Sequence, residues 1–520
     1  MSQSGKSKYS IFLFSDNAVL FYIALFKFII LLIFANNYGL FRDEFYYLAC
    51  ARHLDLGYVD QPALSIFILA ISKTLFGQSI IGVRILAYIA SCVTVFMAGL
   101  IARELNGGKF AQALAAVSVL FAGVLLGSGS YFSMNVFDIL FSTITFYLLI
   151  KLLKNDNPKL WIYIGILFGI GLENKYSFLF LGFGFAIALL LTNRRKDLLS
   201  KYLWIGAGLA VLLFLPHIIW QIKNHYPTLD FIHNAALYKN RPMSFGEFFK
   251  SSIDEMNPVN IILLAAALYY LFINKDGRKF IFAGIAYVAV FLVFVFNNGK
   301  PYYMGILYPM ILAAGAVGID YIITRYLRKW VRYILLIVLL PVYLVAVPFA
   351  IPVLSVDSFI NLTRSLGKVP KNAERSELGL LPQFFSDRFG WEDMVQKTAL
   401  AYNKLSPEEK KHTIIFGQNY GEAGAVEYYS EIYGLQSVPV VSSHNSYWMW
   451  GYPDMAKDTN TVWIVIGSNY KDNSKFFESV EFAASHKSKY GMPFENVDIF
   501  ICKKPKMPVD KIWDRIKLFI

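Results

Sequence analysis

The stretch Ile80–Ala102, IIGVRILAYIASCVTVFMAGLIA, decides the fold, and Arg84 is its one charged residue. About 20 helical residues cross a hydrocarbon core of about 30 Å, so this run is long enough to span a membrane. Similar runs recur through the first two thirds of the 520-residue chain, which is 56% hydrophobic. The sequence therefore predicts a mainly α-helical, polytopic membrane bundle.

The apolar runs predict about eleven spans. They lie at about residues 18–35, 80–102, 111–127, 134–152, 160–173, 176–192, 202–222, 258–273, 280–296, 303–323 and 332–350. The pair at 160–192 is interrupted by Glu173-Asn174-Lys175, so one kinked helix or a re-entrant hairpin is an alternative there. No small-residue cleavage site follows the first run, which we interpret as a retained helix with Lys27 facing the bundle or snorkelling.

Charge predicts the orientation of these spans. With a cytoplasmic N-terminus, the loops at 151–159, 194–201, 275–279 and 325–332 lie inside, and each is rich in Lys or Arg, as the positive-inside rule requires. This topology and anionic lipids account for the net charge of +13. No basic nucleic-acid module is present, so nucleic acid is not an expected partner. The expected location is the plasma (inner) membrane.

An odd number of spans places the chain after about residue 350 outside. There the composition shifts, which predicts two domains, a catalytic bundle at 1–350 and an exterior, periplasmic α/β domain at 351–520. Strands are expected at Thr413–Phe416, Val438–Val441, Val462–Ile466 and Val497–Ile501, and helices at Trp391–Leu405 and Ser474–Ala484.

A short acidic cluster, Asp43 and Glu44, follows the first span. Carboxylates beside a span are costly unless a polar cavity holds them, so they are candidates for function. On the predicted topology, most of the unusual charges near the membrane converge on the exterior side. A lysine there can stabilise a lipid-linked phosphate, and a carboxylate can take a proton from an attacking hydroxyl. This combination is typical of sugar transfer from a polyprenyl phosphate, although other phospholipid chemistry would use it too.

Five ordered segments carry a resemblance to a known family. The chain resembles the bacterial membrane glycosyltransferases related to protein O-mannosyltransferases, glycosyltransferase family 39 with the GT-C fold, and is also similar to lipid A aminoarabinose transferases. The segments are Phe41–Leu64 (FRDEFYYLACARHLDLGYVDQPAL), Pro216–Phe231 (PHIIWQIKNHYPTLDF), Asn297–Ala316 (NNGKPYYMGILYPMILAAGA), Phe416–Leu435 (FGQNYGEAGAVEYYSEIYGL) and Ser442–Tyr452 (SSHNSYWMWGY).

The resemblance implies roles for the first loop. Asp43 would be the catalytic general base, and the alternatives are a helix N-cap or an ion pair with Arg42. Glu44 would either bind the acceptor or support Asp43. Asp60 would bind the acceptor or support the site, unless it only caps the following helix. The chain departs from the pattern at Gln61, where the aminoarabinose transferases have a lysine.

The resemblance also implies roles beyond this loop. Asp138 matches a second acidic position and would orient the acceptor or support the site, with helix capping as its alternative. Lys175 would hold the donor phosphate, unless it snorkels to headgroups. Lys300 would be a second phosphate or sugar contact. Tyr302 and Tyr303 would stack on the sugar or belong to the interfacial aromatic belt.

No cofactor is predicted with certainty. His217, His225 and His233 could ligate a divalent metal, but their spacing of eight residues does not place them in ligand register on one helix, so no metal site is predicted. The run 444–451, HNSYWMWG, could stack on a sugar or dock the exterior domain, and we favour docking.

The sequence thus predicts an inverting glycosyltransferase, hexosyl or pentosyl, that moves a sugar from a polyprenyl-phosphate donor of the undecaprenyl type. The acceptor would be an exterior lipid, polysaccharide or protein hydroxyl. One alternative is a flippase or transporter of lipid-linked sugars. Another is an exterior carbohydrate-binding module tethered by an inactive bundle.

Overall fold

The computed structural model describes residues 15–367 and 375–520, which divide into two compact units. Unit 1 contains the chain up to Asn37, Ser72–Ile218 and Pro242–Val353. Unit 2 contains Tyr38–Ile71, Ile219–Arg241 and Leu354–Ile520. Each unit is therefore built from three separate stretches of chain. The division of the chain into functional domains at residue 350 stays a prediction.

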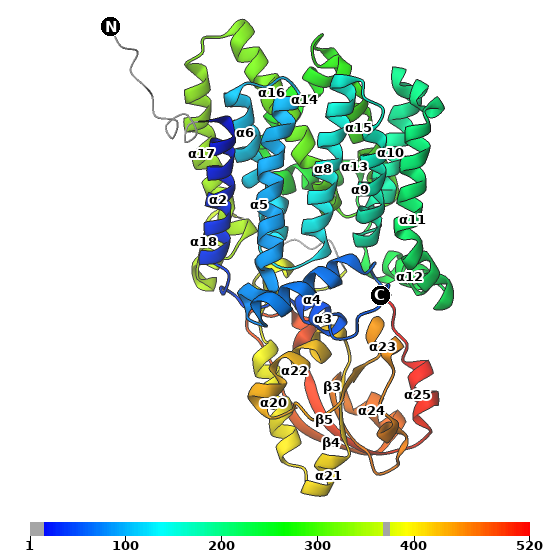
Figure 1. The fold of residues 1–520 in the computed structure, drawn as a ribbon. Coiled ribbons are helices and arrows are strands. Elements are labelled where there is room, and N and C mark those ends of the chain that lie inside the picture. The colour runs from blue at the N-terminus through cyan, green and yellow to red at the C-terminus, as the bar shows by residue number, and fades with distance from the viewer. Residues whose placement is uncertain (1–14, 368–374) are drawn as a thin grey trace. The chain divides into compact units, whose positions relative to one another are not determined.

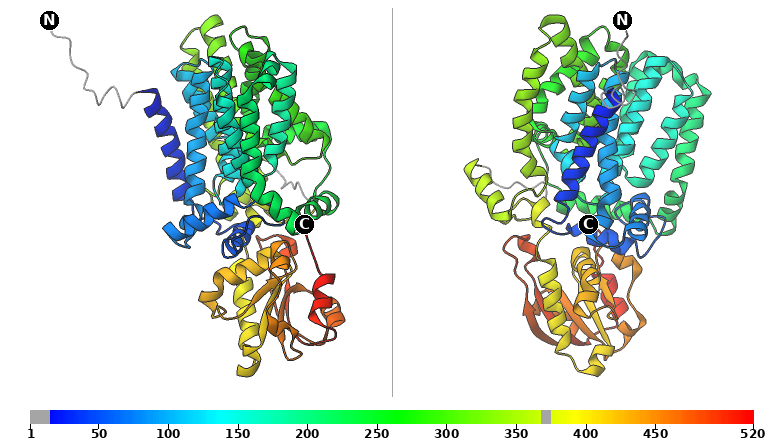
Figure 2. Two further views of the ribbon diagram at one scale, coloured as in Figure 1. Left: turned by 45° about the vertical axis from the view of Figure 1, so that its right-hand side comes forward. Right: turned by 60° about the vertical axis from the view of Figure 1, so that its left-hand side comes forward.

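Unit 1 is a helical bundle, whose helices run side by side in Figure 1 and in the turned views of Figure 2. Its helices are α2 (Asp16–Ile33), α5 (Ile80–Glu104), α6 (Lys109–Leu120), α7 (Gly123–Ser128), α8 (Met134–Asn155), α9 (Leu160–Asn174), α10 (Ser177–Leu191), most of α11 (Lys201–Lys223), α13 (Phe245–Met256), α14 (Ile261–Leu268), α15 (Ile281–Phe296), α16 (Tyr308–Tyr326) and α17 (Val331–Ala350). Short helical turns are η1 (Asn193–Leu199), η3 (Pro258–Asn260), η4 (Tyr269–Ile273), η5 (Arg278–Phe280) and η6 (Pro301–Ile306).

The chain is a multi-pass membrane protein. Among the described residues, six helices are long and apolar enough to cross a membrane, or eight if each of two bent pairs counts as one span. This is fewer than the eleven spans predicted, because several of the predicted runs form shorter helices. The run at 111–127 breaks at Phe121 into α6 and α7, and the run at 160–173 forms the 15-residue helix α9.

Small residues let the helices of unit 1 approach closely. A Cβ atom on Gly165 of α9 would lie 2.1 Å from the carbonyl oxygen of Gly206 in α11. A Cβ on Gly315 of α16 would lie equally close, 2.1 Å, to the carbonyl oxygen of Leu263 in α14. Since lipid tails are as apolar as leucine, such close packing is a main source of association between membrane helices.

Helices α8, α9 and α10 form two consecutive hairpins. Ser177, the first residue of α10, contacts Asp138 near the start of α8. At the far end, Arg194 of η1 pairs with Asp156, which caps the C-terminus of α8. The 22 residues of α8 span about 33 Å. Lys175, between α9 and α10, therefore lies at the end of unit 1 opposite to the basic loop at 151–159.

Unit 2 contains a five-stranded mixed sheet in the order β2-β1-β3-β5-β4. Strands β1, β2 and β3 are parallel, and β5 runs antiparallel to both β3 and β4. Its strands are β1 (Thr413–Gly417), β2 (Val440–Ser442), β3 (Val462–Ser468), β4 (Phe477–Ser485) and β5 (Asp498–Pro505). Its helices are α3 (Arg42–Cys50), most of α4 (Leu64–Phe76), α12 (Pro227–Asn234), α18 (Val356–Ser365), α19 (Gln383–Ser386), α20 (Trp391–Asn403), α21 (Pro407–Lys411), α22 (Tyr420–Tyr433), α23 (Ser446–Trp450), α24 (Tyr470–Phe476) and α25 (Val509–Arg515), with turns η2 (Ala235–Lys239), η7 (Asp454–Lys457) and η8 (Pro493–Glu495).

Successive side chains along a strand point to opposite faces of this sheet, and both faces are buried by apolar residues. In β3, Trp463 and Val465 pack in one cluster with Val509 and Trp513 of α25. Ile464 between them is fully buried on the other face. Helices α20 and α22 lie on the side of the sheet away from α25 (Figure 1). The predicted α/β character of the C-terminal region is therefore confirmed.

One predicted element is wrong. We expected a helix at Ser474–Ala484, but α24 ends at Phe476 and residues Phe477–Ser485 form the edge strand β4. This strand pairs antiparallel with β5, and its register shifts between Phe482 and Ala484. Glu478 and Glu481 obscure the two-residue period, and pairing with β5 outweighs the local helical pattern.

Candidate functional site

Lys175 lies in the two-residue turn between α9 and α10, and its hydrogen-bond and ring contacts are with neutral side chains. Its Nζ donates a hydrogen bond of 2.6 Å to Oδ1 of Asn135 in α8. The same Nζ lies 4.6 Å from the ring centre of Tyr303 and 5.5 Å from that of Tyr302. An amide oxygen and two ring faces orient an ammonium group without neutralising it. The structure thus brings together three predicted residues, Lys175, Tyr302 and Tyr303.

Asp138 holds the turn that carries Lys175. The Ser177 hydroxyl lies 2.7 and 2.6 Å from the two carboxylate oxygens of Asp138, which is 2% exposed. Asn174 Nδ2 donates a bond of 2.9 Å to the carbonyl oxygen of Met134. Together with the bond from Lys175 to Asn135, these contacts clamp the α9–α10 turn onto the start of α8. Asp138 does not act as the N-cap of α8, because Ser133 has that role.

Lys300 immediately precedes η6, the turn that contains Tyr302 and Tyr303. Its side chain is half-buried. Its predicted contact with a phosphate or sugar stays a prediction. Tyr176, beside Lys175, makes a hydrogen bond of 2.5 Å between its hydroxyl and Nε2 of His217. This second polar contact also restrains the turn.

Asp43 lies in the first turn of α3, in unit 2. Its Oδ1 accepts a hydrogen bond of 2.9 Å from the hydroxyl of Tyr420, the first residue of α22. The Nε atom of Arg42 lies 3.8 Å from the same oxygen. The Asp43 side chain is 31% exposed, so one part of the carboxylate is held while another part is accessible. The ion-pair alternative is therefore present, but it leaves the carboxylate open to a hydroxyl.

Arg42 links Asp43 to a buried group of acids. Its Nη1 lies 4.0 Å from Asp387 and 3.9 Å from Glu495. Asn419 Nδ2 lies 3.1 Å from Glu422 and 3.3 Å from Glu495, so one amide bridges two buried carboxyl groups. Burial raises the pKa of Glu495 to about 7, although Arg42 opposes the shift. Burial and the neighbouring Glu495 carboxyl also raise the pKa of Glu422.

Glu44 is placed differently from its neighbour. Its side chain is 0% exposed, and its Oε2 accepts a bond of 2.8 Å from the backbone N–H of Phe41 at the start of α3. This contact satisfies one of the donors that every helix leaves unpaired at its N-terminus. The contact supports the reading of Glu44 as a residue that holds Asp43 in place.

Asp60 belongs to a second polar contact of unit 2. The Tyr46 hydroxyl lies 2.7 Å from Asp60 Oδ1 and 2.8 Å from Oγ of Ser446. Oγ of Ser446 also accepts a hydrogen bond of 3.2 Å from the backbone N–H of Val59. Burial raises the pKa of Asp60 to about 6, while the Tyr46 hydrogen bond opposes the shift. The structure thus ties Asp60 to α3 and to the C-terminal domain.

Gln61 is fully buried, and no hydrogen-bond partner is found for either polar atom of its side chain among the described residues. A buried amide without partners is costly. This is the position where the chain departs from the family pattern.

Sequence reasoning missed the partners that hold the predicted residues. Asn135, Ser177, Tyr420 and Ser446 carry no charge and stand in no recognisable motif. Tyr420 is separated from Asp43 by 377 positions in the chain. The predicted segments containing Tyr420 and Ser446 resemble the family, and that resemblance was the one signal available.

The aromatic run at 444–451 packs within unit 2. Nε1 of Trp448 donates to the carbonyl oxygen of Trp513 at 3.0 Å, and Nε1 of Trp513 donates to that of Trp448 at 3.1 Å. The Trp450 ring stacks on His53, with ring centres 4.3 Å apart. These contacts join the C-terminal segment to the first loop. Sugar stacking by this run stays a prediction.

Within the described ranges, no group of three or more His, Cys, Asp or Glu side chains is arranged to hold a metal ion. Of the three histidines considered in the sequence analysis, His217 makes a hydrogen bond with Tyr176.

Comparisons with known proteins bear on the fold. The family model for dolichyl-phosphate-mannose-protein mannosyltransferase matches residues 60–220. The crystal structure of ArnT from Cupriavidus metallidurans bound to undecaprenyl phosphate superposes with a TM-score of 0.60, at 12% identity, over 96% of this chain and 98% of that one. The chain has the GT-C fold. A GT-C oligosaccharyltransferase from Archaeoglobus fulgidus matches with a TM-score of 0.52 at 12% identity, over 81% of this chain and 63% of that one.

Two curated relatives agree with this GT-C assignment. An undecaprenyl phosphate-alpha-4-amino-4-deoxy-L-arabinose arabinosyl transferase of Pseudomonas fluorescens is 23% identical over 52% of this chain and 50% of its own length. The lipid A galacturonosyltransferase RgtD of Rhizobium johnstonii is 24% identical over 49% of this chain and 54% of its own. The chain thus spans about half the length of the curated relatives it matches. The predicted resemblance to GT-C glycosyltransferases is confirmed.

Proposed function

We propose that this protein is an inverting membrane glycosyltransferase that moves one sugar from an undecaprenyl-phosphate type donor to an acceptor hydroxyl. The reaction takes place at the exterior face of the plasma (inner) membrane. The observation that carries the proposal is the Lys175 ammonium, held by neutral partners at the end of a membrane bundle. Such a cation fits a phosphate that gains negative charge as the sugar leaves.

The proposed reaction is a single displacement. Asp43 accepts the proton of the acceptor hydroxyl, and the acceptor oxygen forms a bond with the anomeric carbon. The bond between that carbon and the phosphate oxygen breaks, and its electron pair remains on the phosphate. Lys175 stabilises this charge, with Lys300 as a second contact. Because the acceptor attacks opposite to the leaving phosphate, the anomeric configuration inverts.

The roles of the other residues follow from their contacts. Asp138 positions the turn that carries Lys175, and Glu44 fixes the start of the helix that carries Asp43. Tyr420 and Arg42 hold the Asp43 carboxylate, while Asp60 and Tyr46 bind the C-terminal segment at Ser446. The relatives named above act on lipid A or use an arabinose donor, which supports a glycolipid acceptor. That Asp43 and Lys175 lie on the same side of the membrane stays a prediction.

Mass spectrometry of exterior lipids and glycans tests the proposal in cells that lack the gene and carry a plasmid copy. The wild type should restore a mass increment of one sugar, and Asp43→Asn should not, although the protein accumulates normally. Asp454→Asn is the matched control, because Asp454 is exposed and pairs with Lys457 on the surface. A normal product in Asp43→Asn cells would refute the assigned base. No sugar difference between cells with and without the gene would refute the transferase.

A further inference from the structure

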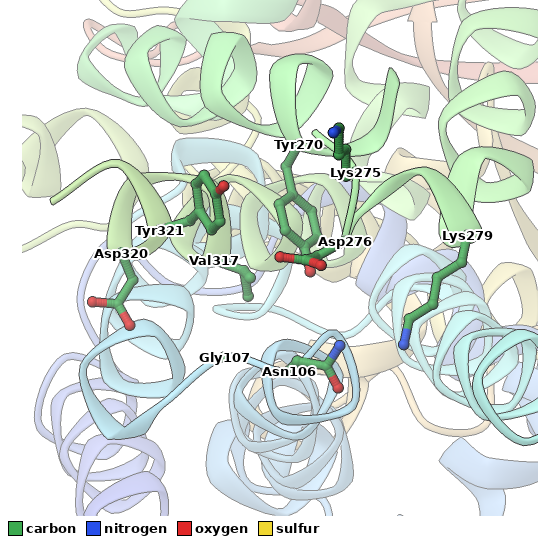
Figure 3. A pocket seen from close by; sticks show the side chains of 9 residues that line it. All are labelled: Asn106, Gly107, Tyr270, Lys275, Asp276, Lys279, Val317, Asp320 and Tyr321. Carbon is green, nitrogen blue, oxygen red and sulfur yellow. The ribbon is translucent and has the colours of Figure 1, made fainter. Parts of the chain in front are cut away.

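A polar cavity of about 320 Å³ opens in unit 1, away from Lys175. Figure 3 shows its lining, which comes from the α5–α6 connection, from α16 and from the turn before α15. The polar lining residues are Asn106, Tyr270, Lys275, Asp276, Lys279, Asp320 and Tyr321. Cavities of about 300 Å³ or more are typical of small-molecule sites. This space is thus large enough for the polar part of a small molecule.

The walls of this cavity are held in place. Oδ1 of Asn274 accepts the backbone N–H groups of Asp276 and Gly277 at 2.9 and 3.0 Å, which fixes the turn that carries Lys275. A Cβ on Gly277 would lie 2.0 Å from the carbonyl oxygen of Tyr270, so the turn packs directly on η4. The Tyr270 hydroxyl donates a bond of 2.7 Å to the carbonyl oxygen of Leu105 at the end of α5.

The charges in the cavity are only partly compensated from within. Asp320 pairs with Arg332 of α17 at 2.6 Å. In the described part of the chain, Lys275, Lys279 and Asp276 form no ion pair, although all three line one cavity. Two cations and one anion therefore remain for a ligand. This set favours a ligand with one anionic group for the lysines and hydroxyl donors for Asp276.

The same end of the bundle carries the basic loops. Lys154, at the end of α8, pairs with Glu104, and Arg332 of α17 pairs with Asp320. By the positive-inside rule this is the cytoplasmic end, where anionic phospholipid headgroups concentrate. Basic pockets between membrane helices on that side commonly bind phosphate headgroups.

We propose that this cavity binds the phosphate diester headgroup of an anionic phospholipid, with Lys275 and Lys279 as the cations that attract the phosphate. Asp276 accepts hydrogen bonds from the headgroup hydroxyls, and the Asn106 amide donates to them or accepts from them. The proposal does not depend on the transferase reaction, because it concerns a separate region of unit 1.

Native mass spectrometry of the full-length protein, with added lipids of defined headgroup, tests the proposal. The probes are phosphatidylglycerol, phosphatidylcholine and soluble glycerol 3-phosphate. We expect phosphatidylglycerol to bind in preference to phosphatidylcholine, and Lys275→Ala/Lys279→Ala to bind it about thirtyfold more weakly. Asp276→Asn should bind it more tightly, because one negative charge leaves the cavity.

The matched control is Arg328→Ala/Lys329→Ala, which removes the same charge from the exposed loop between α16 and α17. Retained binding in this control, with loss in the Lys275/Lys279 variant, supports the site. Equal loss of phosphatidylglycerol binding in both variants would show general charge attraction and would overturn the proposed site. Equal binding of phosphatidylglycerol and phosphatidylcholine would overturn it as well. Effective competition by glycerol 3-phosphate would keep the phosphate site and assign it to a soluble ester instead of a lipid.

Discussion

The Lys175 cluster and the Asp43 cluster treat charge in opposite ways. Lys175 is held by an amide and two tyrosine rings, so its positive charge is left for a ligand. Asp43 lies beside Arg42, whose charge is shared among Asp387, Glu495 and Asp43 itself. One cluster thus holds its cation through neutral contacts, with the Asp138 carboxylate near enough to interact electrostatically, and the other balances several charges around a partly open carboxylate. In the proposed reaction, a phosphate binder needs the first property and a general base needs the second.

The difference predicts that Lys175 variants lose the most activity. Lys175→Ala should lower kcat about 100- to 1,000-fold, because Lys175 is the main cation proposed for the leaving phosphate and Lys300 is a second contact. Lys175→Arg should recover part of this loss. Kinetics with purified protein and a synthetic polyprenyl-phosphate sugar measure both, and Lys196→Ala, which removes an exposed lysine paired with Asp156, is the control. Wild-type kcat in Lys175→Ala would show that the Lys175 charge serves no catalytic purpose.

Variants of Asp138 test whether activity depends on the geometry of the Lys175 cluster or on the negative charge of Asp138. Asp138→Asn keeps an oxygen that accepts the Ser177 hydroxyl, so kcat should stay within about tenfold of the wild type. Asp138→Ala releases the clamp, and misplacement of Lys175 should cost about 100-fold. Similar losses in both variants would instead show that the negative charge of Asp138 takes part in the reaction. The same donor assay distinguishes these outcomes.

Both clusters show how far the sequence alone could lead. Asp43 and Glu44 were recognisable because carboxylates beside an apolar run are costly, whereas Lys175 and Asp138 were assigned through the resemblance to a family. The sequence located the eleven apolar runs but did not predict how long a helix each run forms, because breaks such as that at Phe121 depend on tertiary packing. Tyr420 could not be assigned to Asp43, because folding brings together residues 377 positions apart. The strand β4 was missed for the same reason, as its partner β5 follows it in the chain and overrides the local pattern.

Tyr420 measures how much Asp43 depends on the neutral hydroxyl that donates a hydrogen bond to it. Tyr420→Phe removes the hydrogen bond to Asp43 and should lower kcat about tenfold, with little change in KM. Tyr433→Phe is a matched control, since Tyr433 makes a hydroxyl contact of 3.1 Å with the surface residue Glu392. An equal effect in both variants, or a change in KM alone, would contradict a positioning role for Tyr420.

The smallest expected effect is on the pH dependence of stability. Burial raises the pKa of Glu495 to about 7, against about 4.3 in an unfolded chain, so the folded state binds its proton more tightly. This group therefore lowers the free energy of unfolding as the pH rises from about 4 to 7. Glu495→Gln removes the titration and should reduce the difference in Tm between pH 5 and pH 8, measured by thermal unfolding in nanodiscs.

Glu409→Gln is the opposite control. Hydrogen bonding to Lys503 lowers the pKa of Glu409 to about 2, so the stabilisation that Glu409 provides is constant above pH 5. Loss of this stabilisation should therefore shift Tm equally at both pH values. If Glu495→Gln left the pH dependence unchanged while lowering Tm uniformly, the buried acids beside Arg42 would already be charged at pH 5, and the charge balance inferred for the Asp43 cluster would be wrong.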